Sequence, residues 1–151
     1  MNTAKSKGSV ISIEGFSNGT TETIIQAGEF RFVIDEPESF GGCNKAPSPV
    51  AYLLGAVSGC IVAIGMQVAK ELGMTITKLN TKVDGSINSE AFFGISQDER
   101  AGFSEIRIVV DVESDAAPEQ LSRWTSEVEK RCPVIDNLVY TTRVTIHQHL
   151  R

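Results

Sequence analysis

The feature that most constrains the fold is a long stretch without a charged side chain, Ala46–Ala69. Pro49 stands near its start and Gly73 follows its end, and these residue types favour the first turn and the termination of a helix. Ser48 is well placed to cap that helix. We therefore expect a helix from Pro49 to Leu72. A helix that is apolar on every face has to be buried centrally, in a domain or in a dimer.

A membrane location for this helix is the main alternative, because the stretch is long enough to cross a bilayer. Prolines and glycines interrupt it, however, and single lysines, Lys45 and Lys70, flank it on both sides. Such symmetric flanks lack the positive bias that orients membrane helices. We therefore expect no membrane partner.

The length and net charge of the chain limit the class of protein to which it can belong. A chain of 151 residues fits one domain, which we place at residues 1–151. Its net charge of −5 argues against a nucleic-acid partner, since phosphate binding requires a basic surface. The polar segment Met1–Ser9 lacks the apolar core of a secretory signal, so we expect a cytoplasmic protein. In that reducing compartment its cysteines should be thiols rather than structural disulfides.

The rest of the chain alternates short strands with one more helix. Turn residues Ser17-Asn18-Gly19 predict a hairpin between the first two strands. The expected strands are residues 10–14, 21–26, 30–35, 78–87, 91–96, 103–113 and a closing strand, Val139–Gln148. Leu121, Trp124 and Val128 at helical spacing predict an amphipathic helix over 115–130. This order predicts the α+β class.

Two cysteines stand in informative places. Cys60 lies within the apolar helix, and Cys132 lies at the end of the second helix, immediately before Pro133. A buried free cysteine is commonly just a small hydrophobe, and Cys60 alone fits that role. A thiol at a helix C-terminus is not activated by the helix dipole, so Cys132 suits a resolving cysteine better than an attacking one. Together they indicate thiol redox chemistry.

Metal and hydrolytic chemistry have weaker support. The chain has no C-x-x-C motif, and His147 and His149, two positions apart near the C-terminus, have no evident third ligand. We therefore expect no metal and no cofactor. A hydrolase that pairs Cys60 with His147 lacks an evident oxyanion loop. Cys43, in the glycine-rich loop, is accidental or regulatory.

Motifs spread along the chain resemble the OsmC/Ohr superfamily over residues 28–147. They are Asp35-Glu36-Pro37, Gly41-Gly42, Pro47-Ser48-Pro49, Gly59-Cys60, Gly102-Phe103 and Cys132-Pro133-Val134. The resemblance implies an intertwined homodimer in which two central buried helices are flanked by β-sheets. It also implies reduction of organic hydroperoxides: Cys60 attacks the peroxide and becomes a sulfenic acid, Cys132 closes a disulfide with it, and an external dithiol reduces the pair.

The sequence departs from this family at two positions. The resemblance implies a glutamate just after the helix-opening proline and an arginine in the N-terminal hairpin, whereas this chain has Val50 and Ala51 at the first site. No arginine lies in residues 16–19, and Arg31 on the neighbouring strand is the candidate substitute. These departures favour a second hypothesis, a non-enzymatic dimer of the same fold that binds a small hydrophobic ligand and keeps unreactive thiols.

Overall fold

A computed structural model describes residues 8–96 and 98–150. The described residues fall into two compact units, one within residues 1–52 and one within 53–151. The boundary between them lies inside the long apolar helix. The α+β class is confirmed, and the assignment of the whole chain to one domain stays a prediction.

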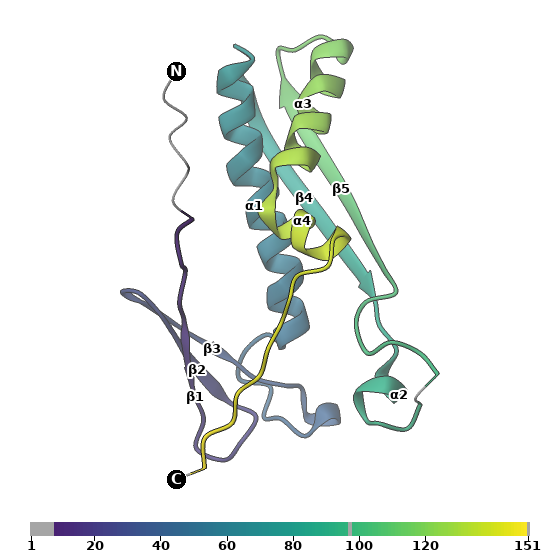
Figure 1. The fold of residues 1–151 in the computed structure, drawn as a ribbon. Coiled ribbons are helices and arrows are strands. Elements are labelled where there is room, and N and C mark those ends of the chain that lie inside the picture. The colour runs from purple at the N-terminus through teal and green to yellow at the C-terminus, as the bar shows by residue number, and fades with distance from the viewer. Residues whose placement is uncertain (1–7, 97, 151) are drawn as a thin grey trace. The chain divides into compact units, whose positions relative to one another are not determined.

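The first unit contains a three-stranded antiparallel sheet in the order β1-β2-β3, drawn in purple and blue in Figure 1. Its strands are Glu14–Phe16, Thr23–Ala27 and Phe30–Ile34. The predicted hairpin is confirmed, with Gly19 in the left-handed region at φ 82°. The first strand begins later than predicted.

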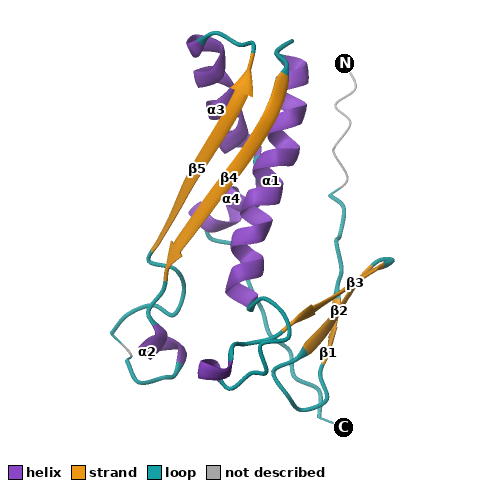
Figure 2. Cartoon of the chain, turned by 180° about the vertical axis from the view of Figure 1, so that it is seen from behind, coloured by secondary structure: helices purple, strands orange, loops and turns teal. Residues whose placement is uncertain are grey.

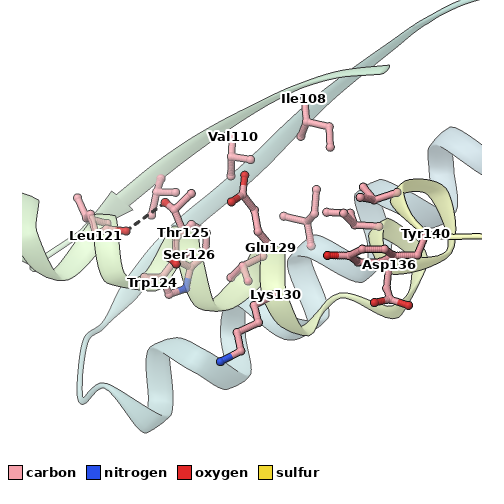
Figure 3. A pocket seen from close by; sticks show the side chains of 15 residues that line it. Ile108, Val110, Leu121, Trp124, Thr125, Ser126, Glu129, Lys130, Asp136 and Tyr140 are labelled. Carbon is pink, nitrogen blue, oxygen red and sulfur yellow. Dashed lines mark hydrogen bonds between the residues drawn. The ribbon is translucent and has the colours of Figure 1, made fainter. Parts of the chain in front are cut away.

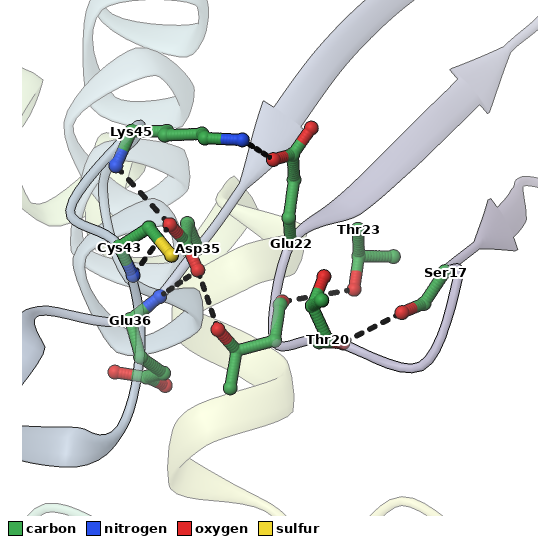
Figure 4. Close-up of polar contacts among 9 residues, drawn as sticks. Ser17, Thr20, Glu22, Thr23, Asp35, Glu36, Cys43 and Lys45 are labelled. Carbon is green, nitrogen blue, oxygen red and sulfur yellow. Dashed lines mark hydrogen bonds and ion pairs between the residues drawn. The ribbon is translucent and has the colours of Figure 1, made fainter.

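A buried carboxylate organises the loop that follows this sheet (Figure 4). The Asp35 side chain is fully buried and accepts a hydrogen bond of 2.6 Å from the Thr21 hydroxyl. It also accepts backbone N–H bonds from Glu36, Cys43 and Lys45. These donors, Thr21 first, lower the pKa of Asp35 to about 2. Asp35, ionised at neutral pH, therefore holds both ends of the loop together.

The loop itself contains the short 3-10 helix η1, Glu38–Phe40. Gly42 is required where the chain folds back, because a Cβ there would lie 1.8 Å from the carbonyl oxygen of Glu36. Gly42, the second glycine of the Gly41-Gly42 pair, thus marks a close approach of two backbone segments.

The second unit combines a two-stranded antiparallel ribbon with two long helices. The helices are α1, Pro49–Glu71, and α3, Pro118–Arg131, and the strands are β4, Ile76–Ser86, and β5, Glu105–Ser114. Figures 1 and 2, taken from opposite sides, show both helices on one face of the ribbon. Gly73, at φ 66°, follows the end of α1 as predicted.

The core of this unit lies between α1, α3 and the ribbon. Its buried members are Val57, Ile61, Val68, Ala69, Met74, Trp124 and Val128. Other sides of α1 remain uncovered, and Met66 is 46% exposed. Among the described residues α1 is the one helix long and apolar enough to cross a membrane, a test that core helices of soluble proteins also pass. Within the second unit, α1 is therefore covered on one side only.

The predicted strand over residues 91–96 is wrong. A short helix, α2 (Ser89–Phe92), starts just before these residues and includes the first two of them. The side chain of Asn88 caps this helix by accepting a hydrogen bond of 2.9 Å from the N–H of Glu90. Local capping outweighs the strand preference of the aromatic residues here.

The closing strand Val139–Gln148 is also wrong. Helix α4 occupies Pro133–Val139, and the described residues after it, 141–150, contain no strand. Val144 and Ile146 alternate as a strand would but are 79% and 92% exposed. A strand exists only where another strand supplies its hydrogen bonds, and no described strand of this chain pairs with this segment.

Candidate thiol site

Cys132 stands at the junction of two helices. It follows the last residue of α3, and Pro133 opens α4 immediately after it. Its N–H donates to the carbonyl of Val128 at 3.1 Å, and its carbonyl accepts from the N–H of Asp136 at 3.0 Å. Proline suits the first helical position because its missing N–H is not needed there. The local sequence thus fixes this cysteine in the backbone of both helices, with 0% of its surface exposed.

The fold brings Cys60 of α1 against Cys132, so that their thiols are hydrogen-bonded. Burial, and secondly the Cys132 thiol, raise the pKa of Cys60 above its usual range. The backbone N–H of Val134 acts in the opposite direction by donating a hydrogen bond to Cys60. The sequence analysis missed this donor. Its signal was Pro133, which opens a helix whose first N–H, that of Val134, has no carbonyl partner within the helix.

This arrangement can form a disulfide, because hydrogen-bonded thiols need only a small movement to reach bonding distance. It can also support a sulfenic acid on Cys60, which Cys132 is placed to attack. In the described part of the chain, no cation is among the groups that shift the pKa of Cys60. The thiol therefore lacks an activating charge within its own unit.

The other predicted positions lie elsewhere. Arg31 is exposed on β3, in the first unit, where its Nε–H donates to the Gln26 amide oxygen at 2.6 Å. Its place relative to the cysteines stays a prediction. Val50 and Ala51 form the first turn of α1, which contains no acidic residue. Cys43 is exposed in the loop that Asp35 organises. The described residues contain no cluster of three histidine, cysteine or acidic side chains suited to a metal.

An ion pair that involves Arg131, the residue before Cys132, was not predicted. Arg131, the last residue of α3, donates two hydrogen bonds to the carboxylate of Glu71, at 2.5 and 3.0 Å. Gln67 adds a third at 3.2 Å. Arg131 is the main cause that lowers the pKa of Glu71 to about 2. The pair ties the end of α1 to the end of α3, one residue before Cys132.

A cavity of about 1070 Å³ opens beside the core of the second unit (Figure 3). It has an apolar floor and polar residues at α3 and α4. Its lining residues are Ile61, Ile108, Val110, Val112, Leu121, Trp124, Thr125, Ser126, Val128, Glu129, Lys130, Ile135, Asp136, Val139 and Tyr140. The lining includes neither Cys60 nor Cys132, although Ile61 follows Cys60 directly in the chain. The cavity therefore has a lining separate from the two thiols.

Comparison with solved structures places this fold among known ones. An OsmC-like protein from Mycoplasma pneumoniae is 23% identical, with a TM-score of 0.77 over 89% of this chain and 91% of that one. An organic hydroperoxide resistance protein from Elizabethkingia anophelis is 15% identical, with a TM-score of 0.63 over 87% and 89% of the chains. One from Legionella pneumophila, also described as OsmC and a predicted redox protein, is 11% identical, with a TM-score of 0.61 over 86% and 89%.

Two sequence comparisons were informative in different ways. No curated protein matches the chain. The family described as OsmC-like protein matches residues 42–147, which include the apolar helix and both cysteines of the thiol site. The chain therefore belongs to the OsmC-like protein family.

Proposed function

We propose that this protein reduces organic hydroperoxides with the thiols of Cys60 and Cys132. The observation that carries the proposal is the hydrogen-bonded pair itself, in which a half-buried thiol on α1 faces a fully buried one at the α3–α4 junction. The fold supports it, because structures of similar fold include proteins described as organic hydroperoxide resistance proteins.

The reaction would run in three steps. The Cys60 thiolate attacks the distal peroxide oxygen, which breaks the O–O bond and releases an alkoxide that takes a proton to become the alcohol. The resulting sulfenic acid condenses with the Cys132 thiol, forming the disulfide and releasing water. An external dithiol then reduces this disulfide and is itself oxidised to a disulfide. No metal or other cofactor takes part.

The raised pKa of Cys60 sets a requirement, since the thiolate is the nucleophile. A cation near the sulfur would favour the thiolate, and we assign this role to Arg31. The Arg31 side chain is exposed, and its described side-chain hydrogen bond runs from Nε–H to Gln26. Its two terminal NH2 groups therefore remain available as donors.

We further propose that two copies of the chain form the working unit, a cytoplasmic homodimer. Apolar side chains of α1 that the second unit leaves uncovered, such as Met66, need a partner surface. A Cβ built at Gly55 or Gly59 meets no described atom within 4 Å, so this side of the helix has room for a second helix. The alternating segment 141–150 would find its neighbouring strand in the second copy.

Thiol accounting tests the activity. Reduced protein mixed with cumene hydroperoxide should lose two thiols per chain, and peptide mapping should find Cys60 linked to Cys132. In Cys132→Ser, a sulfenic acid on Cys60 should persist and react with dimedone, whereas Cys60→Ser should leave the peroxide unconsumed. Wild-type protein that keeps both thiols in excess peroxide would refute the proposal.

A second function has its own supporting observations. The raised pKa of Cys60 favours an unreactive thiol, and the cavity lined by Trp124 has the apolar floor that a small hydrophobic ligand requires. A non-enzymatic binding protein would show fluorescence of Trp124 changed by an apolar probe such as 1-anilinonaphthalene-8-sulfonate. It would also leave Cys60 unreactive toward peroxide. Binding of the probe without loss of thiols would favour this alternative.

A further inference from the structure

The two sulfurs of the thiol site differ in their access to solvent. Cys132 has no exposed surface, whereas Cys60 is half-buried. Residues of its own chain bury Cys132 completely, so association with a second copy would not expose it. Any molecule that reacts with the oxidised pair therefore meets two unequal sulfur atoms.

The backbone prevents Cys132 from moving outward to remove this difference. Its N–H is bonded to Val128 in α3 and its carbonyl to Asp136 in α4. Trp124, earlier on α3, is also buried, with an indole N–H bonded to the Gly65 carbonyl of α1 at 2.8 Å. Exposing the Cys132 sulfur requires separating these helices. Within its own chain Cys60 needs no comparable rearrangement, because part of its surface is already exposed there.

We propose that reduction of the oxidised site begins at the sulfur of Cys60 and that Cys132 is always the leaving group. This rests on the proposed function, which supplies the disulfide. The incoming thiolate bonds to the Cys60 sulfur while the Cys60–Cys132 bond breaks, and its electron pair leaves on Cys132, which takes a proton from water. The second thiol of the reductant then displaces Cys60 from the mixed disulfide, so that the dithiol leaves oxidised and both cysteines are reduced. Cys60 thus bonds to both peroxide oxygen and reductant sulfur, and Cys132 bonds only to Cys60.

A trapping experiment tests the order of attack. Cys43 is exposed and would take label, so the protein carries Cys43→Ser. Diamide closes the Cys60–Cys132 disulfide without peroxide, so this test does not depend on peroxidase activity. A brief pulse of glutathione, a monothiol, stops at the mixed disulfide, and acid followed by N-ethylmaleimide preserves it. Peptide mapping should find glutathione on Cys60 and maleimide on Cys132, in at least about tenfold excess over the reverse pattern.

Single-cysteine proteins provide a matched measurement that avoids thiol exchange within the pair. The Cys43→Ser/Cys132→Ser protein keeps only Cys60, and Cys43→Ser/Cys60→Ser keeps only Cys132. With an aromatic disulfide reagent, the first should react at least about tenfold faster than the second, and urea should make the two rates equal. Equal rates in the folded proteins, or glutathione found mainly on Cys132, would overturn the proposal. If diamide closes no disulfide, the paired site is wrong; if it does but peroxide does not, the peroxidase proposal alone fails.

Discussion

The indole N–H of Trp124 donates a hydrogen bond of 2.8 Å to the carbonyl oxygen of Gly65, in the middle of α1. Trp124 is 2% exposed, and a Cβ placed on Gly65 would lie 2.7 Å from its ring carbon Cζ2. Because Gly65 has no side chain, the indole ring can pack directly against α1, and the Gly65 carbonyl accepts its hydrogen bond. This contact sets the spacing of α1 and α3, and with it the position of Cys132 opposite Cys60.

Gly65→Ala should therefore destabilise the protein, although alanine is the better helix former. The indole cannot withdraw without breaking its hydrogen bond, and Leu79 lies 3.3 Å from the same Cβ position. We expect a net loss of about 1–3 kcal/mol in the free energy of unfolding, typical of overpacking. Urea denaturation followed by circular dichroism would measure it.

A double-mutant comparison is the control for this prediction. In a Trp124→Phe background the clashing part of the ring is gone, so Gly65→Ala should be less destabilising than in the wild type. The same loss in both backgrounds would show that Trp124 is not the cause.

Asp35→Asn should make stability less dependent on pH at the acid end. The pKa of Asp35 is about 2 in the folded protein and near 3.8 in an unfolded chain. A lowered folded-state pKa contributes stability that is complete above about pH 4 and is lost as the pH falls toward 2. Thermal unfolding between pH 2 and 6 should show this loss in the wild type and a smaller one in Asp35→Asn. Thr21→Val removes the main cause of the shift and should move the transition upward in pH; an unchanged profile would contradict the assignment.

Arg131→Met should destabilise the protein at neutral pH, and the difference from wild type should shrink as the pH approaches 2. Glu71, with a pKa of about 2, is charged in the folded protein down to that pH. Arg131→Lys keeps the charge but loses the two-pronged hydrogen bond, so its stability should fall between the two. Added salt should weaken the effect, because both side chains are partly exposed. Identical stability of all three proteins would show that the ion pair is inert.

Cys132→Ala should lower the pKa of Cys60 without returning it to the ordinary cysteine value. Burial is the larger cause of the raised pKa and remains, whereas the thiol hydrogen bond is lost. In a Cys43→Ser background, the rate of alkylation by iodoacetamide against pH reports the Cys60 thiolate. Its midpoint should move to lower pH in Cys132→Ala and less in Cys132→Ser, which keeps a hydroxyl in place. A midpoint that moves upward would contradict this account of the site.

Gly59→Leu distinguishes a dimer from a monomer. In the isolated chain a Cβ at residue 59 meets no described atom within 4 Å, so a monomer should accept leucine. In a dimer that packs on this side of α1 the substitution should weaken association. Light scattering should find the wild type at twice 16.3 kDa and the variant shifted toward 16.3 kDa at the same concentration. A wild-type monomer at micromolar concentration would refute the dimer.

Much of the fold follows from short-range patterns in the sequence. Pro49 and Gly73 bracket α1, and Gly19 closes the first hairpin, because each of these conformations depends on a few neighbouring residues. The amphipathic spacing of Trp124 and Val128 likewise predicted α3 and its buried face. For the site, the sequence placed Cys132 at a helix end and singled out Cys60 through the motif around it.

The tertiary structure decided the contacts between segments that are distant in the chain. The hydrogen bond between Cys60 and Cys132, the N–H of Val134 and the Arg131–Glu71 pair all join α1 to the α3–α4 region. No local pattern encodes which helix turns meet, because that depends on how Trp124 fits over Gly65. The closing strand failed for the same reason: residues 141–150 have the alternation of a strand, but a strand forms only where a neighbouring backbone supplies its hydrogen bonds.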